Sequence, residues 1–481
     1  MKRFIRISYC LSFMLFVTVS SHNPNAASSE KEILGAMKKA TVYMMNTVSY
    51  RGGFVWQYSE DLSQQWGEVP ARRTQIWVQG ATNGIGELLL DIYDATGDTA
   101  YLEYAKRTAH AIIWGQHPAG GWHYFIDFDM TGIRRWYDKV GSKCWGWEEY
   151  NHYYGNCTYD DDTTASSLRF LLRLYMTTLD PAYREPLLRG LDFVLESQYP
   201  NGAWPQRYPL MYEYVKQGRA DYTSFYTYND GVMKNNIMLL VDAWEKLGNE
   251  EYRKAAVRGM DFYIISQGAP PQAGWGEQHY HDLRPAHART YEPAAFHSRQ
   301  TMFNIRDLQT FYTITGDRRY LKPIPPAISW LEQSIINTDT SKNYSHHRYY
   351  EPGSNKPIYI YREGTSIENG RHYESFKPTV PGGDQNIDID ALRKEYERVS
   401  ALSPDEAQAE YDRIKNRVKK RSRIETDKIE ALLSSLNGKG AWITDLTIRN
   451  YIDPGRPVRI IRGISTRSYI SNMRALLSNL E

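Results

Sequence analysis

Three consecutive aspartates, Asp160 to Asp162, stand directly before an apolar run at helical spacing, in the stretch CTYDDDTTASSLRFLLRLY. One aspartate is enough to cap a helix, because its carboxylate accepts free backbone amides and suits the positive end of the helix dipole. Three adjacent carboxylates repel one another, and the excess charge calls for a counter-charge. A hard cation such as Ca²⁺ takes several oxygen ligands, carboxylates among them. A cap and a cation site are therefore both open interpretations.

A second acidic helix start lies one repeat further along, in YTYNDGVMKNNIMLLVDAW. Asn229 and Asp230 again precede an apolar run at helical spacing, and a cap is again the simpler interpretation of these residues alone. In a ring of helices, however, helices of alternate type begin at the same end. The two acidic starts would then face one cleft.

Basic residues in short loops complete the set. RPAHARTYEP places Arg289 in a proline-bounded loop, and RYYEPGSNKPIYIYREG carries Arg348, Lys356 and Arg362. A single arginine is usually a solvated surface residue. Clustered beside tyrosine and proline, these arginines suit bidentate recognition of carboxylate groups.

A turn that recurs along the chain predicts the elements that position these residues. It reads TGDTAY, LDPAY, LGNEEY and TGDRRY, with the tyrosines Tyr101, Tyr183, Tyr252 and Tyr320. A helical run and then a Gly-Trp loop follow each turn, and the loops read GGFVWQY, GGWHY, NGAWPQRY and AGWGEQHY. Each unit is therefore a helix pair, and stacking the pairs around a ring buries their apolar faces. The predicted fold is all-α: an α/α toroid, or incomplete α/α barrel, of repeated helix pairs with long loops at one end. A linear solenoid is the alternative.

Composition limits the class of protein. The 481 residues carry a net charge of +2, which supplies no overall field toward a polyanion. A mean hydropathy of -0.60 excludes a polytopic membrane protein. A basic start and the apolar segment 7–19 predict a signal peptide over 1–28, and hence a secreted or periplasmic protein. Cys144 and Cys157 then either form a disulfide or remain two buried thiols.

The composition also suggests how the chain is divided. We predict the toroid over 29–380 and a charged helical C-terminal extension over 381–481, packed on the toroid or following it. The basic run at 415–423 is interpreted as a solvated helix face. The last segment, STRSYISNMRALLSNL, is predicted to be an amphipathic helix.

From about residue 30 to Gly364, the sequence resembles the pectate lyases of polysaccharide lyase family 10. YDDDTTASSLRFL resembles the family's Asp-Asn-x-x-Thr helix start, NGAWPQRYP its Gly-Trp-Pro-Gln-x-Tyr-Pro loop, and YTYNDGVM its Phe-Asn-Asp segment. HARTYEP and RYYEPGSNKPIYIYREG match two further segments, although Lys356 replaces the usual arginine. The resemblance implies an α/α toroid and a secreted enzyme. Such an enzyme cleaves 4-linked galacturonan by calcium-assisted β-elimination and releases 4,5-unsaturated oligogalacturonides.

The resemblance also implies roles for single residues. Asp160 and Asp230 would bind Ca²⁺, and Arg289 would be the catalytic base. The implied substrate-binding residues are Arg348, Arg362, Lys356, Asp161, Thr164, Asn229 and Trp204. Because a guanidinium group is almost always protonated, His287 is an alternative base. The opening question then has a divided answer, with Asp160 reaching the cation and Asp162 or Thr163 capping the helix.

Two other functions stay open. A glycoside hydrolase on the same fold would use Asp162 and Asp230 as its acid and base, without a metal. A non-catalytic pectin-binding protein would bind the polymer and release no product. In each case the expected partner is an acidic polysaccharide rather than a nucleic acid. We expect a monomer that does not span a membrane once the signal peptide is removed.

Overall fold

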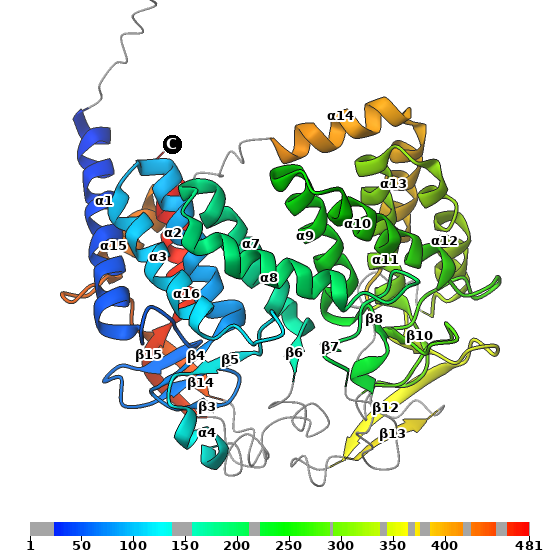
Figure 1. The fold of residues 1–481 in the computed structure, drawn as a ribbon, viewed down its shortest axis with the longest axis horizontal. Helices are drawn as coiled ribbons and strands as arrows, with labels where there is room; N and C mark the ends of the chain where they lie inside the picture. Colours follow the sequence, from blue (N-terminus) through cyan, green and yellow to red (C-terminus); the bar gives the residue numbers. More distant parts are fainter. Residues whose placement is uncertain are drawn as a thin grey trace, which may run out of the picture.

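The computed structural model describes residues 24–136, 156–210, 222–288, 292–336, 344–363, 371–375, 385–416, 425–448 and 459–480. Helices stand side by side in an arc, with short strands and long loops gathered at one end (Figure 1). Four helices precede the repeated turn: α2 (Asn83–Thr96), α7 (Thr163–Thr178), α9 (Val232–Leu247) and α11 (Ser298–Thr315). Three helices follow the turn directly: α3 (Thr99–Trp114), α8 (Pro181–Glu196) and α10 (Glu250–Ile265). In the fourth unit the short helix η7 (Arg318–Leu321) follows the turn, and α12 (Ile324–Gln333) comes next.

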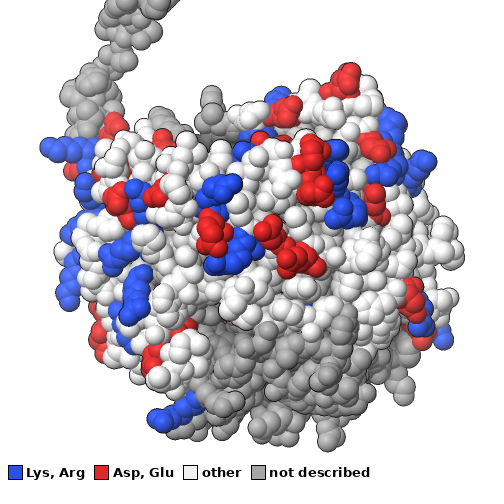
Figure 2. Space-filling view, in the orientation of Figure 1, with Lys and Arg blue, Asp and Glu red and all other residues white. Residues whose placement is uncertain are grey.

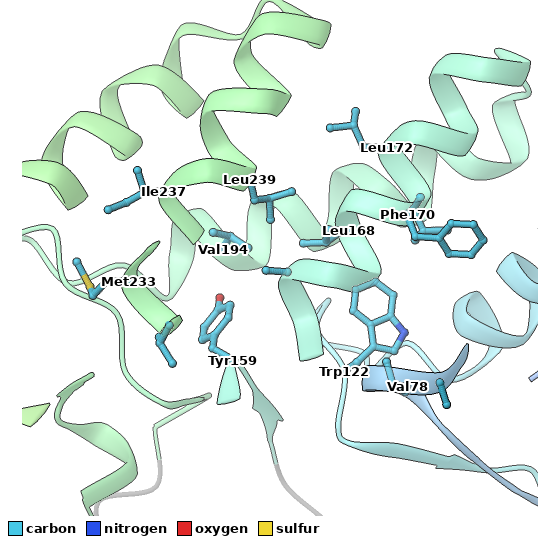
Figure 3. Packing of buried hydrophobic residues seen from close by; sticks show 14 of the residues in the cluster. Val78, Trp122, Tyr159, Leu168, Phe170, Leu172, Val194, Met233, Ile237 and Leu239 are labelled. Atoms are coloured by element: carbon cyan, nitrogen blue, oxygen red, sulfur yellow. The ribbon is translucent and has the colours of Figure 1, made fainter. Parts of the chain in front are cut away.

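The repeated turn owes its shape to a side-chain cap and a buried tyrosine. Asp98, Asp180, Asn249 and Asp317 each accept a hydrogen bond from the backbone N–H two residues later. The four tyrosines of the turns are at most 3% exposed. Each turn therefore joins two packed helices, as the sequence predicts. Leu168 of α7, Val194 of α8 and Ile237 of α9 meet in the core between these pairs (Figure 3).

The Gly-Trp loops interlock the units. The indole Nε1 atoms of Trp122, Trp204 and Trp275 donate to backbone carbonyls of the helix just before, over 2.8, 2.8 and 2.9 Å. In the second of these loops, Gly202 has φ of +97°, and a Cβ atom there would lie 1.9 Å from the carbonyl oxygen of Arg258 on α10. Only glycine allows the loop to lie this close to the next unit.

The first loop departs from the expected register. The Phe54 N–H donates to the Thr82 hydroxyl over 3.0 Å, as the Trp122 N–H does to Thr164 over 3.1 Å. Phe54 therefore takes the place of the tryptophan, and Trp56 lies two residues further on.

Short antiparallel ladders join the loops to the starts of the preceding helices. The pairs are β4 (Gln75–Trp77) with β5 (Phe125–Asp127), β6 (Cys157–Thr158) with β7 (Arg207–Tyr208), and β8 (Tyr226–Thr227) with β9 (Gln278–His279). A four-stranded sheet runs in the order β10 (Phe296–His297), β11 (Tyr349–Tyr350), β12 (Pro357–Glu363) and β13 (Arg371–Ser375). The remaining short helices are η1 (Met44–Val48), η2 (Val78–Thr82), α4 (Met130–Trp136), η4 (Asp160–Asp162), η5 (Tyr222–Ser224) and η6 (Asn229–Gly231).

The C-terminal region returns to the start of the chain. Helices α13 (Ile389–Ala401) and α14 (Pro404–Lys415) contact α11, whereas α15 (Thr426–Ser435) and α16 (Thr466–Leu477) contact α1 (Pro24–Tyr43). A five-stranded sheet combines β14 (Thr444–Ile448) and β15 (Arg459–Ser465) with β1 (Gln57–Ser59), β2 (Gln65–Trp66) and β3 (Pro70–Ala71). The C-terminal region therefore adds helices to both ends of the arc, and the helix-rich fold is the predicted α/α toroid.

The region also contains elements that the sequence analysis did not assign to the repeat. Trp442 Nε1 donates to the Leu432 carbonyl over 2.9 Å, which is the same bond that the Gly-Trp loops make. The predicted terminal amphipathic helix is confirmed as α16. The proposed boundary at residue 381 stays a prediction, as does the solvated helix face at 415–423, because residues 417–424 lie outside the described part of the chain.

Two further expectations concern the N-terminus and the cysteines. Residues 1–23 of the predicted signal peptide lie outside the described chain, and α1 begins at Pro24. None of the described helices is long and apolar enough to cross a membrane. Cys157 is a buried free thiol, and burial raises its pKa to about 12. Cys144 lies outside the described residues, so whether the two cysteines pair stays a prediction.

Candidate active site

The two acidic helix starts lie against each other. Turn η4 contacts turn η6, and each leads directly into a helix, α7 or α9. Their backbones match: Asp161 and Asp162 have φ of 50° and 61°, and Asp230 and Gly231 have φ of 51° and 73°. The structure therefore brings the two predicted acidic starts together.

Buried tyrosines define how the two turns correspond. The Tyr159 hydroxyl bonds Ser197 Oγ over 2.5 Å, and the Tyr228 hydroxyl bonds Ser266 Oγ over 2.7 Å. In both cases the serine lies 38 residues further along the chain. Counting from these tyrosines, Asp161 occupies the place of Asp230, and Asp160 occupies the place of Asn229.

Neither turn caps its helix with a side chain. Helix α7 begins after Asp162, whose carboxylate pairs with Arg169 instead of accepting a backbone amide. Burial raises the pKa of Asp162 in spite of this arginine. The Thr163 hydroxyl has no hydrogen-bond partner within the described residues. The expectation that Asp162 or Thr163 caps α7 is therefore wrong, because the left-handed backbone at Asp162 turns its side chain toward Arg169.

The aspartates differ in exposure. Asp160 is 2% exposed and accepts a hydrogen bond from the Tyr124 hydroxyl. Asp161 and Asp230 are exposed. Gln79 Nε2 donates to Asp161 over 3.4 Å, and Asn229 Nδ2 donates to Asp230 over 2.9 Å. The exposed carboxylates of the two turns are thus the structurally equivalent pair, Asp161 and Asp230.

A cavity of about 460 Å³ opens beside η6. It brings Asn229, Asp230 and Arg348 together, as the sequence predicts for a site that binds an acidic ligand. The other lining residues are Tyr228, Gly231, Lys234, Tyr263, Glu277, His297, Arg299, Gln300, Phe303 and Asp307.

The carboxylate of Glu277 forms one wall of this cavity. Its backbone carbonyl accepts from the N–H groups of Tyr228 and Asn229 over 2.8 and 3.0 Å, which anchors turn η6. Its side chain accepts from the Tyr349 hydroxyl over 3.0 Å and lies 3.2 Å from His297 Nε2. Burial alone would raise the pKa of Glu277, but His297, the Arg348 charge and the Tyr349 hydrogen bond lower it overall. Glu277 is therefore ionised at neutral pH.

A second charged pair lies on another wall. Lys234 Nζ lies 2.6 Å from Asp307 Oδ1, and the Tyr263 hydroxyl donates to Asp307 Oδ2 over 3.1 Å. Burial raises the pKa of Asp307 even beside this lysine. Lys234 lies in the first turn of α9, four residues after Asp230, and both side chains line the cavity.

Sequence reasoning missed Glu277, His297, Lys234 and Asp307. Two signals could have found some of them. Lys234 stands four residues after a candidate metal ligand. Glu277 stands two residues after Trp275. The predicted Arg348 stands two residues after His346, which takes the place of the tryptophan in its own loop.

The repeat itself places Arg348. One loop position in each unit accepts the same backbone hydrogen bond, from an N–H at the start of the preceding unit's helix. The acceptor and donor pairs are Tyr124 with Val78, Gln206 with Tyr159, Glu277 with Tyr228, and Arg348 with Ser298. The distances are 2.8, 2.9, 2.8 and 3.1 Å. This position therefore contributes one side chain per unit at the loop end. The Arg348 guanidinium lies 5.7 Å from the Tyr349 ring centre.

The structure buries two residues that were predicted to bind substrate. Thr164 is 0% exposed, and its hydroxyl donates to the Thr158 carbonyl over 2.7 Å. Trp204 is also 0% exposed and donates to the Val194 carbonyl. Both side chains hold the loops in place, so these two assignments are corrected to structural roles.

Three other predicted residues lie apart or outside. Arg289 and the side chain of Arg362 lie outside the described part of the chain. Lys356 is exposed in the turn between β11 and β12 and does not line the cavity. The alternative base His287 bonds the Tyr280 hydroxyl through Nδ1 over 2.6 Å. The roles proposed for these residues stay predictions.

Acidic and basic side chains are interspersed over the helical face in Figure 2. This agrees with the small net charge of the chain. Attraction for an acidic ligand must therefore come from local groups such as Arg348 and Lys234.

Comparison with known proteins assigns the segment that holds this site. Residues 146–376 match the family model described as pectic acid lyase. A family 10 polysaccharide lyase from Cellvibrio cellulosa, solved as a mutant with trigalacturonic acid, is 17% identical. That structure overlays 67% of this chain and 99% of its own, with a TM-score of 0.43. An α-1,6-mannanase from Salegentibacter sp. HEL1_6 is 13% identical and overlays 94% and 100%, with a TM-score of 0.39. These sequence identities are too low for the substrate of either protein to be assigned to this chain. No curated protein matches the chain significantly.

The helix-pair fold is an incomplete α/α toroid, and the segment that holds the candidate site matches a polysaccharide lyase family model. Within that class, residues 146–376 carry the pattern of the pectic acid lyase family. The resemblance predicted from the sequence is thereby confirmed.

Proposed function

We propose that the protein is a secreted pectate lyase that cleaves 4-linked galacturonan by calcium-assisted β-elimination. The products would be 4,5-unsaturated oligogalacturonides. One observation carries the proposal: turns η4 and η6 touch beside a cavity that also contains Arg348. All three lie within the segment that matches the pectic acid lyase family.

The chemistry requires cations at the substrate carboxylate. The C5 proton of a galacturonosyl unit becomes acidic enough to remove only when the adjacent C6 carboxylate is neutralised. Arg348 can pair with that carboxylate through its guanidinium, and its Nε is buried with no hydrogen-bond partner in the described residues. Lys234 adds a second positive charge beside Asp230. These residues would hold the sugar with its acidic group inside the cavity.

The residues present fit a calcium ion. Asp161 and Asp230 are exposed carboxylates on two touching turns, Asn229 offers an amide oxygen, and Asp160 stands next to them. Hard oxygen donors of this kind are those that Ca²⁺ prefers. Bound there, Ca²⁺ would supply further neutralisation of the substrate carboxylate. No group of three or more acidic, histidine or cysteine side chains converges as a metal site among the described residues, so water and substrate oxygens would complete the coordination.

Two residues remain candidates for the base that removes the C5 proton. Arg289 is the residue that the family resemblance implies, and it requires a strongly lowered pKa. His287 needs no such shift, and its Nδ1 shares a hydrogen bond with the Tyr280 hydroxyl. Substitution of each of these two residues would identify the base.

The direct test is ultraviolet absorbance of polygalacturonate incubated with the purified protein, with Ca²⁺ and in parallel with EDTA. We expect a Ca²⁺-dependent rise from the conjugated double bond of the product. New reducing ends without that rise would indicate a hydrolase. Binding without any product would indicate a pectin-binding protein. Secretion is tested separately, by sequencing the N-terminus of protein recovered outside the cytoplasm.

A further inference from the structure

A second cavity, of about 590 Å³, lies outside the segment that matches the pectic acid lyase family. It opens between the first loop of the chain and the C-terminal strands β14 and β15. Its walls include Trp56, Trp66, Glu68, Ile448 and Arg467. This cavity therefore exists only because the C-terminal region packs back on the N-terminal unit.

Two indole rings form the apolar part of this cavity. Trp56 is half-buried and is held by hydrogen bonds from its Nε1 to the carbonyl and the side-chain oxygen of Gln79, each 3.2 Å long. Trp66 packs against Ile448 in a small core beneath the strands. Gly80 has φ of +64°, the left-handed conformation that favours glycine, and it lines the cavity beside Trp56. A half-buried indole offers a surface on which a flat, partly apolar ligand such as a sugar ring can pack.

The cavity also has a cationic end. Arg467 is exposed in the first turn of α16 and forms no ion pair with any described residue. Ser465 caps that helix by accepting the Ser468 N–H over 3.2 Å, so the positive end of the helix dipole points at the same region. A half-buried indole beside a guanidinium suits a sugar that carries a carboxylate.

A single side chain separates this cavity from the acidic turns. Gln79 accepts from Trp56 through Oε1 and donates through Nε2 to Asp161 over 3.4 Å. A ligand that leaves the acidic turns on this side therefore reaches Trp56 within a few sugar units.

We propose that this cavity is a distal subsite that binds a uronic acid unit of the polysaccharide, several units from the bond that is cleaved. The proposal rests on the proposed function, because it takes the ligand to be the same acidic chain. Trp56 receives the sugar ring beside the buried Trp66, and Arg467 pairs with its carboxylate. The enzyme would therefore prefer long chains over short ones.

The test is calorimetric binding of purified saturated oligogalacturonates of three and of eight units, in EDTA to prevent turnover. Wild-type protein should bind the octamer at least tenfold more tightly than the trimer. Arg467→Glu should lose about ten- to a hundredfold of octamer affinity, the range of a charge-assisted hydrogen bond, and leave the trimer unchanged. Arg459→Ala is the matched control, because it removes an exposed positive charge from β15 outside the cavity.

Trp56→Ala, checked for folding by thermal unfolding, should reproduce the octamer-specific loss. Equal octamer binding by wild type and Arg467→Glu, or no gain from trimer to octamer in the wild type, would overturn the proposal. Octamer binding that depends on Arg467, together with no unsaturated product in the Ca²⁺ assay, would refute the lyase function and leave this subsite standing.

Discussion

Asp161 and Asp230 occupy the same place in two touching turns, with φ of 50° and 51°. Each is the second residue after a buried tyrosine that bonds a serine 38 residues further on. Neither turn ends in a side-chain cap, although the helix starts at Asp98, Asp180 and Asn249 all do. The acidic turns therefore do not cap their helices through a side chain, which agrees with the proposed role of Asp161 and Asp230 in binding calcium.

Asp230→Asn tests this relationship without disturbing the backbone, since asparagine tolerates the left-handed conformation. We expect turnover of polygalacturonate to fall by about a hundredfold or more, the scale on which a site loses a group that stabilises developing charge. The measurement is the initial rate of absorbance increase in saturating Ca²⁺. Asp242→Asn is the control, because that aspartate pairs with Lys246 at the far end of the same helix. Equal rates in the two variants would remove Asp230 from the site.

The base is identified by two substitutions in one loop. Arg289→Lys should abolish nearly all turnover while binding of polygalacturonate persists, because lysine keeps the charge but loses the guanidinium geometry. His287→Ala should keep most of the activity. A dead His287→Ala with an active Arg289→Lys would instead make the histidine the base.

Trp204 is predicted to stabilise the fold rather than to bind substrate. Trp204→Phe removes the indole donor to the Val194 carbonyl and leaves that buried acceptor without its partner. The free energy of unfolding should fall by about 1–3 kcal/mol, while KM on polygalacturonate stays the same. Denaturant unfolding and steady-state kinetics measure the two effects. A higher KM at unchanged stability would restore the substrate-binding role.

Gly202→Ala should destabilise the protein more strongly. The new Cβ would lie 1.9 Å from the Arg258 carbonyl oxygen, and alanine resists the φ of +97°. We expect a loss of about 2–4 kcal/mol from strain and overpacking. Gly438→Ala is the matched control, since no atom lies within 4 Å of its added Cβ. Similar melting temperatures for both variants would show that the loop does not depend on this close approach.

The raised pKa of Asp307 predicts that the stability of the protein depends on pH. Burial raises its folded-state pKa above the unfolded value of about 3.8, so the folded state holds the proton more tightly. The resulting stabilisation is complete below pH 3.8 and is lost as pH rises through the folded pKa. Relative to Asp307→Asn, the wild type should therefore lose free energy of unfolding as pH rises from about 4. A constant difference between the two proteins across that range would contradict the raised pKa.

Local patterns in the sequence were enough to predict the repeat, because each turn depends on its own cap and tyrosine. They did not reveal the loops at His346 and Trp442. His346 Nε2 lies 2.8 Å from the Leu331 carbonyl, where the other loops use an indole, and Trp442 belongs to a region whose charged composition resembled an extension. The repeat at these loops is visible only once the hydrogen bonds are known.

The candidate site was predicted in part for the same reason. Asp230, Asn229 and Arg348 belong to compact motifs, and the structure brings them to one cavity. Glu277 has a spacing signal in its own loop, whereas His297 and Asp307 join the site from the start and the body of α11, and no motif marked them. The cap predicted at Asp162 failed because its left-handed backbone and its ion pair with Arg169 arise in the folded turn.

We propose that the two acidic turns form one calcium site that serves elimination. The decisive measurement is the Ca²⁺ concentration that gives half-maximal absorbance increase, for wild type, Asp161→Asn and Asp230→Asn. We expect both variants to need at least about tenfold more Ca²⁺ than the wild type, with product that is still unsaturated. Half-maximal Ca²⁺ concentrations equal to that of the wild type, or full activity in EDTA, would contradict it.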